Sequence, residues 1–281
     1  MAAETMTIAM ISDVFVGNGA EDRLLARLTE ARSLGAELAV LPELPCNPWS
    51  PATKTRRDED AEPPGGPRQR MQAAAARSTG VALIGGAIIR DPVSGVRRNT
   101  AVVLDGSGRQ LGTYSKIHLP EEEGFWETSH YEPGREPPSP VAGLPMRIGV
   151  QICSDINRPE GCHLLGAMGA EVIIAPRATE QRTYERWKIV FRANAMTSGA
   201  YVVSVNRPGP EQGVLMGPPS GSIAVAPDGS VICESCEPVT VVTLHREAVR
   251  AAAKAYPGYL DIPASLYAEA WREVAARRNK A

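Results

Sequence analysis

The sequence predicts a mixed α/β fold built on a large two-layer sheet system. Short β-branched or apolar runs recur along the chain, and each is closed by Gly, Pro, Asp or Asn, as strands commonly are. Between several of these runs lie stretches whose apolar residues fall at three- and four-residue intervals, which is the helical period. Strands alternating with helices, with strand pairs inserted, are typical of this class.

The predicted strands are these apolar runs, in chain order residues 6–12, 36–43, 81–89, 99–106, 146–153, 170–176, 200–206, 221–229 and 238–245. The predicted helices have apolar residues at helical spacing, and a Gly often follows their last turn. They are residues 20–35, 68–80, 160–171 and 184–199. The pairs Asp105-Gly106 and Asp228-Gly229 stand between strand-like runs and predict hairpin turns that need a positive φ.

We expect a single domain over residues 1–281, because no internal repeat or composition shift divides the chain. Two stretches rich in Pro and charged residues, 45–67 and 131–141, predict long surface loops. Residues 264–281 are charged and helix-prone, and they predict a C-terminal helical extension that packs on the outside or on a partner subunit.

Composition limits the class of partner. A formal charge of -2 and a pI of about 6.2 provide no basic field for nucleic acid or an anionic membrane, so we expect a small-molecule partner. The five cysteines are an odd number spread over a long chain, and the N-terminus lacks the basic start of a secretory signal. No run approaches the roughly 18 to 20 apolar residues of a membrane span. We therefore expect a cytosolic protein with reduced thiols.

Three ionisable residues stand at or just beyond predicted strand ends: Glu43 in LPEL, Lys116 in YSKIHLP and Cys153 in GVQICSD. In α/β sheets, pockets form at the carboxyl ends of strands, so side chains from separate strands can converge there. Burying a glutamate or a lysine alone is costly, but a Glu, a Lys and a thiol placed together offset one another's charge. Their convergence is the hypothesis for the structure.

These three residue types together indicate nucleophilic chemistry. A free thiol has a pKa of about 8.5, which a nearby ammonium lowers, and a carboxylate can accept its proton as the sulfur attacks. Cys153 is then the nucleophile and Glu43 the base. Attack on an amide carbonyl creates an oxyanion, and Lys116 and the backbone amide of Ser154 are the expected donors to it.

The ordered motifs LPEL, YSKIHLP and GVQICSDINRPE resemble the nitrilase superfamily of carbon–nitrogen hydrolases. The resemblance covers about residues 8–267 and includes the segments GFWETSHYEPG, AEVIIAP, RANAMTSGAYVVSVNR and GSIAVAPDG. It implies a four-layer αββα sandwich, a Glu-Lys-Cys triad and a thioester (acyl-enzyme) intermediate, with neither a cofactor nor a metal. It also implies a homodimer or a higher homo-oligomer.

Carried over position by position, the resemblance makes Glu43 the general base, Lys116 the lysine and Cys153 the nucleophile. A second glutamate of the family, which helps hold the lysine and orient the substrate, falls on Glu127 in GFWE. Three other glutamates lie close by, but only Glu127 has the aromatic pair before it and YEPG after it.

Three further positions are candidates for substrate contact: Trp126, Ser154 and Arg177. Ser154 stands where the family often has Trp or Tyr, which predicts a wider or more polar pocket wall. Arg177 follows a strand end and is suited to a substrate carboxylate; alternatively, it holds a loop carbonyl or pairs with Glu180. The acidic run PEEEG at 120–124 favours a cationic amine instead, so the charge of the substrate stays open.

The expected reaction is hydrolysis of a small linear amide or N-carbamoyl compound, with release of ammonia. Two alternatives remain: a nitrilase that acts on a small nitrile, and a catalytically silent family member that acts as a binding subunit. The sequence CESC at residues 233–236 has the spacing of a metal or redox motif. No second pair accompanies it, and a zinc site needs about four ligands, so we interpret it as a coincidence.

Overall fold

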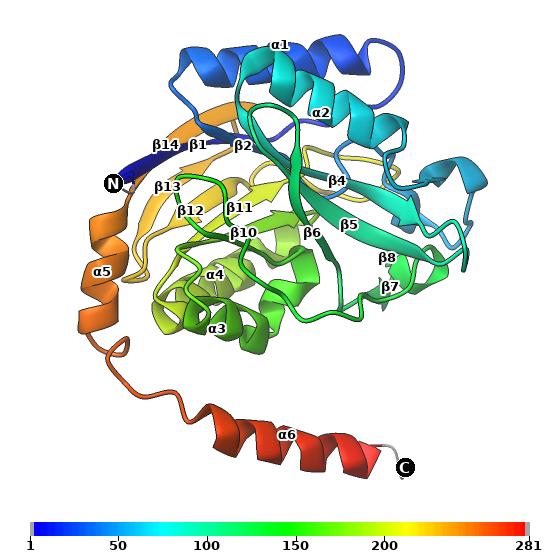
Figure 1. The fold of residues 1–281 in the computed structure, drawn as a ribbon. Helices are drawn as coiled ribbons and strands as arrows, with labels where there is room; N and C mark the ends of the chain where they lie inside the picture. Colours follow the sequence, from blue (N-terminus) through cyan, green and yellow to red (C-terminus); the bar gives the residue numbers. More distant parts are fainter. Residues whose placement is uncertain (1–2, 279–281) are drawn as a thin grey trace.

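The computed structural model describes residues 3–278 as a mixed α/β structure in four layers (Figure 1). Two β-sheets face each other, and helices cover the outer face of each sheet. This arrangement confirms both the mixed α/β class and the αββα sandwich that the resemblance implied. The first two residues of the predicted domain, and the last three of the predicted C-terminal extension, lie outside the described residues.

The first sheet has the strand order β14-β1-β2-β4-β5-β6, with the short β3 beside β4. Pairing is parallel from β1 through β2 to β4, whereas β14 and the β5–β6 hairpin pair antiparallel with their neighbours. The strands are β1 Thr5–Ile11, β2 Leu38–Val40, β3 Ala61–Glu62, β4 Ala82–Arg90, β5 Arg97–Leu104, β6 Gln110–Ser115 and β14 Val239–His245.

The second sheet has the order β13-β12-β11-β10-β9, in which β9, β10 and β11 are parallel and β12 and β13 are antiparallel. A small hairpin of β7 and β8 lies outside both sheets. The strands are β7 Glu121–Glu122, β8 Phe125–Trp126, β9 Ile148–Val150, β10 Val172–Arg177, β11 Tyr201–Asn206, β12 Ser222–Val225 and β13 Val231–Ser235.

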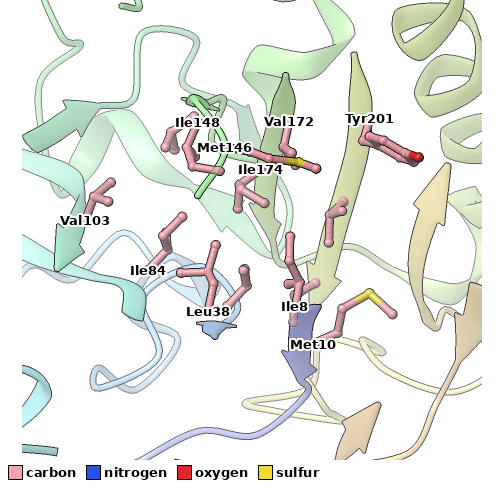
Figure 2. Packing of buried hydrophobic residues seen from close by; sticks show 14 of the residues in the cluster. Ile8, Met10, Leu38, Ile84, Val103, Met146, Ile148, Val172, Ile174 and Tyr201 are labelled. Atoms are coloured by element: carbon pink, nitrogen blue, oxygen red, sulfur yellow. The ribbon is translucent and has the colours of Figure 1, made fainter. Parts of the chain in front are cut away.

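The main core lies between the two sheets. Figure 2 shows Ile8, Leu38 and Ile84 of the first sheet packed against Ile148 and Ile174 of the second, and all five side chains are fully buried. Fully burying one aliphatic side chain stabilises the fold by about 1.5–3 kcal/mol. Because the inward-facing residues alternate along each strand, this layer fixes how the strand ends of the two sheets face each other.

Helices seal the outer faces of the sandwich. Leu28 and Ala76 pack on the first sheet, and Phe191 packs on the second. The helices that carry these residues, or pack beside them, are α1 Ala20–Ser33, α2 Pro67–Thr79, α3 Pro159–Ala167 and α4 Tyr184–Ser198. The four predicted helices are thus confirmed, with shifts of a few residues at their ends.

Both predicted hairpins are present, but only one has its positive φ where the sequence predicted it. Gly229 has a φ of 82°. In the other turn the residue with a positive φ is Gly108, at 79°, and not Gly106. The carboxylate of Asp105 accepts hydrogen bonds from the backbone N–H groups of Ser107 and Arg109, and this side-chain turn moves the left-handed position further along the chain.

The segment 45–67 is not the plain surface loop that its composition predicted. Trp49 is fully buried, packs edge-on against Phe125 at 5.7 Å between ring centroids, and donates its indole N–H to the carbonyl of Gly124. Most of the segment up to Pro51 is buried with it. Aromatic burial therefore folds this segment onto the β7–β8 hairpin.

Two helices follow β14. The sequence did not predict α5 (Arg246–Lys254), whereas α6 (Ala264–Arg278) is the predicted C-terminal helix. Every residue of α6 is exposed, and Figure 1 shows the helix lying apart from the sandwich. Within residues 3–278, no helix is both long and apolar enough to span a bilayer.

Candidate active site

The three residues predicted at strand ends do converge. Glu43 is the third residue after β2, Lys116 directly follows β6, and Cys153 is the third residue after β9. Glu127 joins them from the 3₁₀ turn that follows β8. Because β9 belongs to the second sheet and the other two strands to the first, packing of the sheets against each other creates the cluster.

Lys116 lies at the centre of the cluster and is fully buried. Its Nζ atom is 2.8 Å from Glu43 Oε1 and 2.6 Å from Glu127 Oε1. Burial alone would lower the pKa of Lys116, but the two carboxylates outweigh burial and raise it, so the ammonium stays charged. These two contacts use two of the three Nζ–H donors, which leaves the third for another acceptor.

Glu43 has two inequivalent carboxylate oxygens. Oε1 accepts hydrogen bonds from Lys116 and, at 2.7 Å, from Nδ2 of Asn99. Oε2 is buried and has no hydrogen-bond partner among the described residues. A buried carboxylate oxygen without a donor is costly, and such exceptions mark groups with a chemical task. Oε2 is therefore the atom that can take up a proton.

Glu127 is held from both sides. Its Oε1 contacts Lys116, and its Oε2 accepts a 2.7 Å hydrogen bond from the hydroxyl of Tyr131. Burial raises the pKa of Glu127 to about 7, although the ammonium of Lys116 acts in the opposite direction. Glu127 thus titrates close to neutrality.

We expect the free energy of unfolding of the wild type to fall, relative to that of E127Q, as the pH rises from about 4.5 to about 7. In this range the unfolded chain has lost the carboxyl proton and the folded protein still holds it, so rising pH favours unfolding. Glutamine does not titrate, so the difference between the two proteins isolates this group. Urea denaturation at several pH values measures it; parallel stability curves would contradict the raised pKa.

Cys153 begins the 3₁₀ helix Cys153–Asn157 with a φ of 49°, in the left-handed region that residues other than glycine rarely adopt. Its side chain is 4% exposed, and Sγ donates a 3.7 Å hydrogen bond to the carbonyl of Ala178. Burial and the carboxylate of Glu43 raise the pKa of the thiol well above its usual value, and Lys116 only partly offsets them. The predicted lowering of this pKa is therefore wrong: the thiol rests neutral and needs a base.

Asp155 anchors the turn that carries Cys153. This buried carboxylate accepts hydrogen bonds from the backbone N–H of His118 at 2.8 Å and from the hydroxyl of Tyr114 at 2.8 Å. Since His118 is two residues beyond Lys116, Asp155 joins the cysteine turn to the lysine segment. The sequence did not single out Asp155, Asn99 or Tyr131; of these only Asp155 offered a signal, as a charged residue just beyond the apolar run that ends at Cys153.

Comparisons with known proteins indicate the family of the chain. A family model described as carbon-nitrogen hydrolase matches residues 20–254. The chain belongs to the carbon–nitrogen hydrolase family. It is 29% identical over 229 residues to an omega-amidase, NIT2, of Xenopus tropicalis, covering 79% of this chain and 80% of that protein. It is also 29% identical over 196 residues to the beta-ureidopropionase of Arabidopsis thaliana, covering 69% of this chain.

The match spans only 48% of the Arabidopsis protein, so the chain covers about half the length of that relative. Among solved structures, a carbon–nitrogen hydrolase from Helicobacter pylori G27 superposes with a TM-score of 0.84 at 20% identity, over 95% of this chain and 98% of that one. This likeness shows the shared fold.

In this carbon–nitrogen hydrolase, Arg177 is fully buried and its guanidinium is largely occupied by the protein itself. Nε donates to the hydroxyl of Ser204 at 2.9 Å, while the terminal nitrogens donate to the hydroxyls of Thr179 and Ser220 and to the carbonyl of Gly221. Of the roles left open by the sequence, the contacts favour holding a loop carbonyl, that of Gly221, over binding a substrate carboxylate. Glu180 pairs with Arg182.

The other two candidates for substrate contact are half-buried. The hydroxyl of Ser154 donates to the carbonyl of His118, so this side chain also joins the cysteine turn to the lysine segment. The indole ring of Trp126 lies beneath the ammonium of Lys54, at 4.0 Å from the ring centroid. Neither contact reveals a substrate, and both residues remain candidates.

The other cysteines lie outside the cluster. Cys46 is buried among the α1 and α2 contacts, and Cys162 is fully buried between α3 and the second sheet. Cys233 is half-buried in β13, and Cys236 is exposed just beyond it. Across residues 3–278, no group of three or more His, Cys, Asp or Glu side chains is arranged to hold a metal ion.

Proposed function

We propose that the protein is a thiol-dependent hydrolase that cleaves the C–N bond of a small linear amide or N-carbamoyl compound and releases ammonia. One observation carries the proposal: a buried ammonium, Lys116, bridges the carboxylates of Glu43 and Glu127 beside a buried neutral thiol. Family membership and relatives named as an omega-amidase and a beta-ureidopropionase support it.

In the acylation step, Glu43 Oε2 takes the proton of the Cys153 thiol as Sγ attacks the carbonyl carbon. The carbonyl oxygen becomes an oxyanion, which accepts hydrogen bonds from the third Nζ–H of Lys116 and from the backbone amide of Ser154. The C–N bond then breaks, and the proton held by Glu43 passes to the leaving nitrogen. Ammonia departs, and a thioester to Cys153 remains.

In the deacylation step, water attacks the thioester carbon and Glu43 again takes the proton. The C–S bond breaks, and the proton returns to Cys153 as the acid is released. With an N-carbamoyl substrate the acid is a carbamic acid, which decomposes to carbon dioxide and an amine. Throughout, Glu127 keeps Lys116 in place and balances its charge.

The test is a panel of N-carbamoyl amines, N-carbamoyl amino acids, dicarboxylic acid monoamides, aliphatic amides and the matched nitriles, with ammonia and the acid product both quantified. We expect turnover of at least one amide or carbamoyl compound and a lower kcat/KM for its matched nitrile. Preference for the nitrile would favour the nitrilase alternative, and the charge of the best substrate decides which sign the pocket prefers.

We further propose that the protein is a homodimer or a higher homo-oligomer in the cytosol. The exposed helix α6 supports the assembly, because it presents large apolar side chains to solvent that a second copy can cover: Leu266, Tyr267, Trp271 and Val274. Light scattering on the full chain and on a chain ending before Ala264 measures the mass of each. If the full chain, like the shortened one, has the mass of a monomer, the proposed assembly is contradicted.

A further inference from the structure

Arg207 is a buried arginine whose N–H groups all donate either to backbone carbonyls within residues 43–47 or to the carboxylate of Glu211. It directly follows β11 in the second sheet and is 0% exposed. Nη1 donates to the carbonyls of Glu43 at 2.9 Å and Leu44 at 2.7 Å. Nη2 donates to the carbonyl of Asn47 at 3.1 Å and to Glu211 at 2.6 Å, and Nε donates to the same carboxylate. The five N–H donors thus meet four acceptor oxygens, since Nε and one Nη2–H share Oε2 of Glu211.

The segment that Arg207 grips has a strained backbone. Leu44 has a φ of 48°, and its side chain is buried. A left-handed residue other than glycine costs of order 1–2 kcal/mol and persists only where its surroundings hold it. Glu211 adds a second hold, because its other carboxylate oxygen accepts the backbone N–H of Trp49 at 2.6 Å. The ion pair of Arg207 and Glu211 therefore hydrogen-bonds to both ends of residues 43–49.

These hydrogen bonds fix the position of the backbone from which the side chain of Glu43 extends. The carbonyl groups on either side of the strained position, those of Glu43 and Leu44, are tied to the second sheet through Arg207, and the second sheet also carries Cys153. Glu43 itself comes from the first sheet, so Arg207 links the base segment directly to the sheet that carries the nucleophile.

We propose that Arg207 is a positioning residue that sets the placement of Glu43 relative to the Cys153 thiol. The inference rests on the proposed function, because it assumes that Glu43 is the base. Only arginine offers five donors in one plane, so lysine at this position cannot serve all the acceptors. A reacting group misplaced by about 1 Å can cost about 10²-fold in rate.

The test compares R207A and R207K with the matched control R246A. Arg246 is also buried and ion-paired, to Glu171, but this pair lies at the start of β10, the opposite end from the cluster. We expect R207A to lower kcat by about 10²-fold with little change in KM, and R207K to fall between it and the wild type. Guanidinium ion, at concentrations far below those that unfold proteins, is expected to raise kcat of R207A and not of R246A.

A second readout is the rate at which iodoacetamide alkylates Cys153, which needs no turnover. Since the thiol rests neutral, alkylation depends on the base, and we expect it to slow in R207A but not in R246A. The inference would be overturned if folded R207A kept both its kcat and its rate of alkylation. It would also be overturned if kcat/KM fell only because KM rose. If R207A does not fold, R207K decides by the same criteria. A wild type that hydrolyses no amide would instead defeat the proposed function.

Discussion

C153A is expected to reduce ammonia release from the best amide to background, a loss of about 10⁵–10⁶-fold in kcat by analogy with removal of other catalytic nucleophiles. Without Sγ there is no atom to form the thioester, and Glu43 has no thiol proton to take. Alanine keeps the left-handed backbone at position 153 and removes only the sulfur, so the fold should persist. Ammonia release by equal amounts of folded protein, verified by circular dichroism, measures the effect.

C162A is the matched control for this experiment. Cys162 is also a buried thiol, and burial raises its pKa to about 12, but it packs between α3 and the second sheet. We expect C162A to retain its kcat. Activity that survives in C153A, or disappears equally in both variants, would contradict the assignment of Cys153 as nucleophile.

K116M is expected to cause the largest combined loss of stability and activity. Methionine fills a similar volume but leaves Glu43 and Glu127, both fully or almost fully buried, without their cation. Breaking a buried ion pair from one side typically costs about 3–5 kcal/mol of stability. Loss of one oxyanion donor alone lowers kcat by about 10²–10³-fold. Urea denaturation and amide turnover measure the two effects.

The double variant K116M/E127Q separates stability from chemistry. Removing the charge of Glu127 leaves only one buried carboxylate, so part of the lost stability should return, while activity should not. The control is K188M, since Lys188 is paired on the surface with Glu185 and Glu234, where such pairs contribute about 0–1 kcal/mol. If K116M is no less stable than K188M, the buried charge cluster does not exist as described.

Most secondary structure was predictable because buried strands and amphipathic helices leave local patterns. The run 170–176 became β10, and 184–199 became α4, with shifts of one or two residues. Two features were not predictable. Helix α5 is short, and apart from one Val its apolar residues are all alanines, which give a weak signal. The burial of Trp49 depends on Phe125, which is 76 residues away in the chain and visible to no local pattern.

Glu43, Lys116 and Cys153 could be found because each ends or follows an apolar run. Asn99 and Arg207 could not be found in this way, because their roles exist only in contacts with a distant segment. Arg177 shows the reverse case: its position suggested a substrate carboxylate, yet its guanidinium is largely occupied by a hydroxyl of β11, a loop hydroxyl and a loop carbonyl. The position of a residue along a strand says little about which acceptors surround it.

The sequence by itself determined the α/β class, the order of the main strands along the chain and the three candidate site residues at strand ends, because these follow from local periodicity and residue type. Only the tertiary structure decided the ionisation of the Cys153 thiol. The sequence placed a cation near the thiol and so predicted a lowered pKa for it, whereas burial and the carboxylate of Glu43 raise this pKa. Desolvation depends on every surrounding atom, and those atoms come from both sheets.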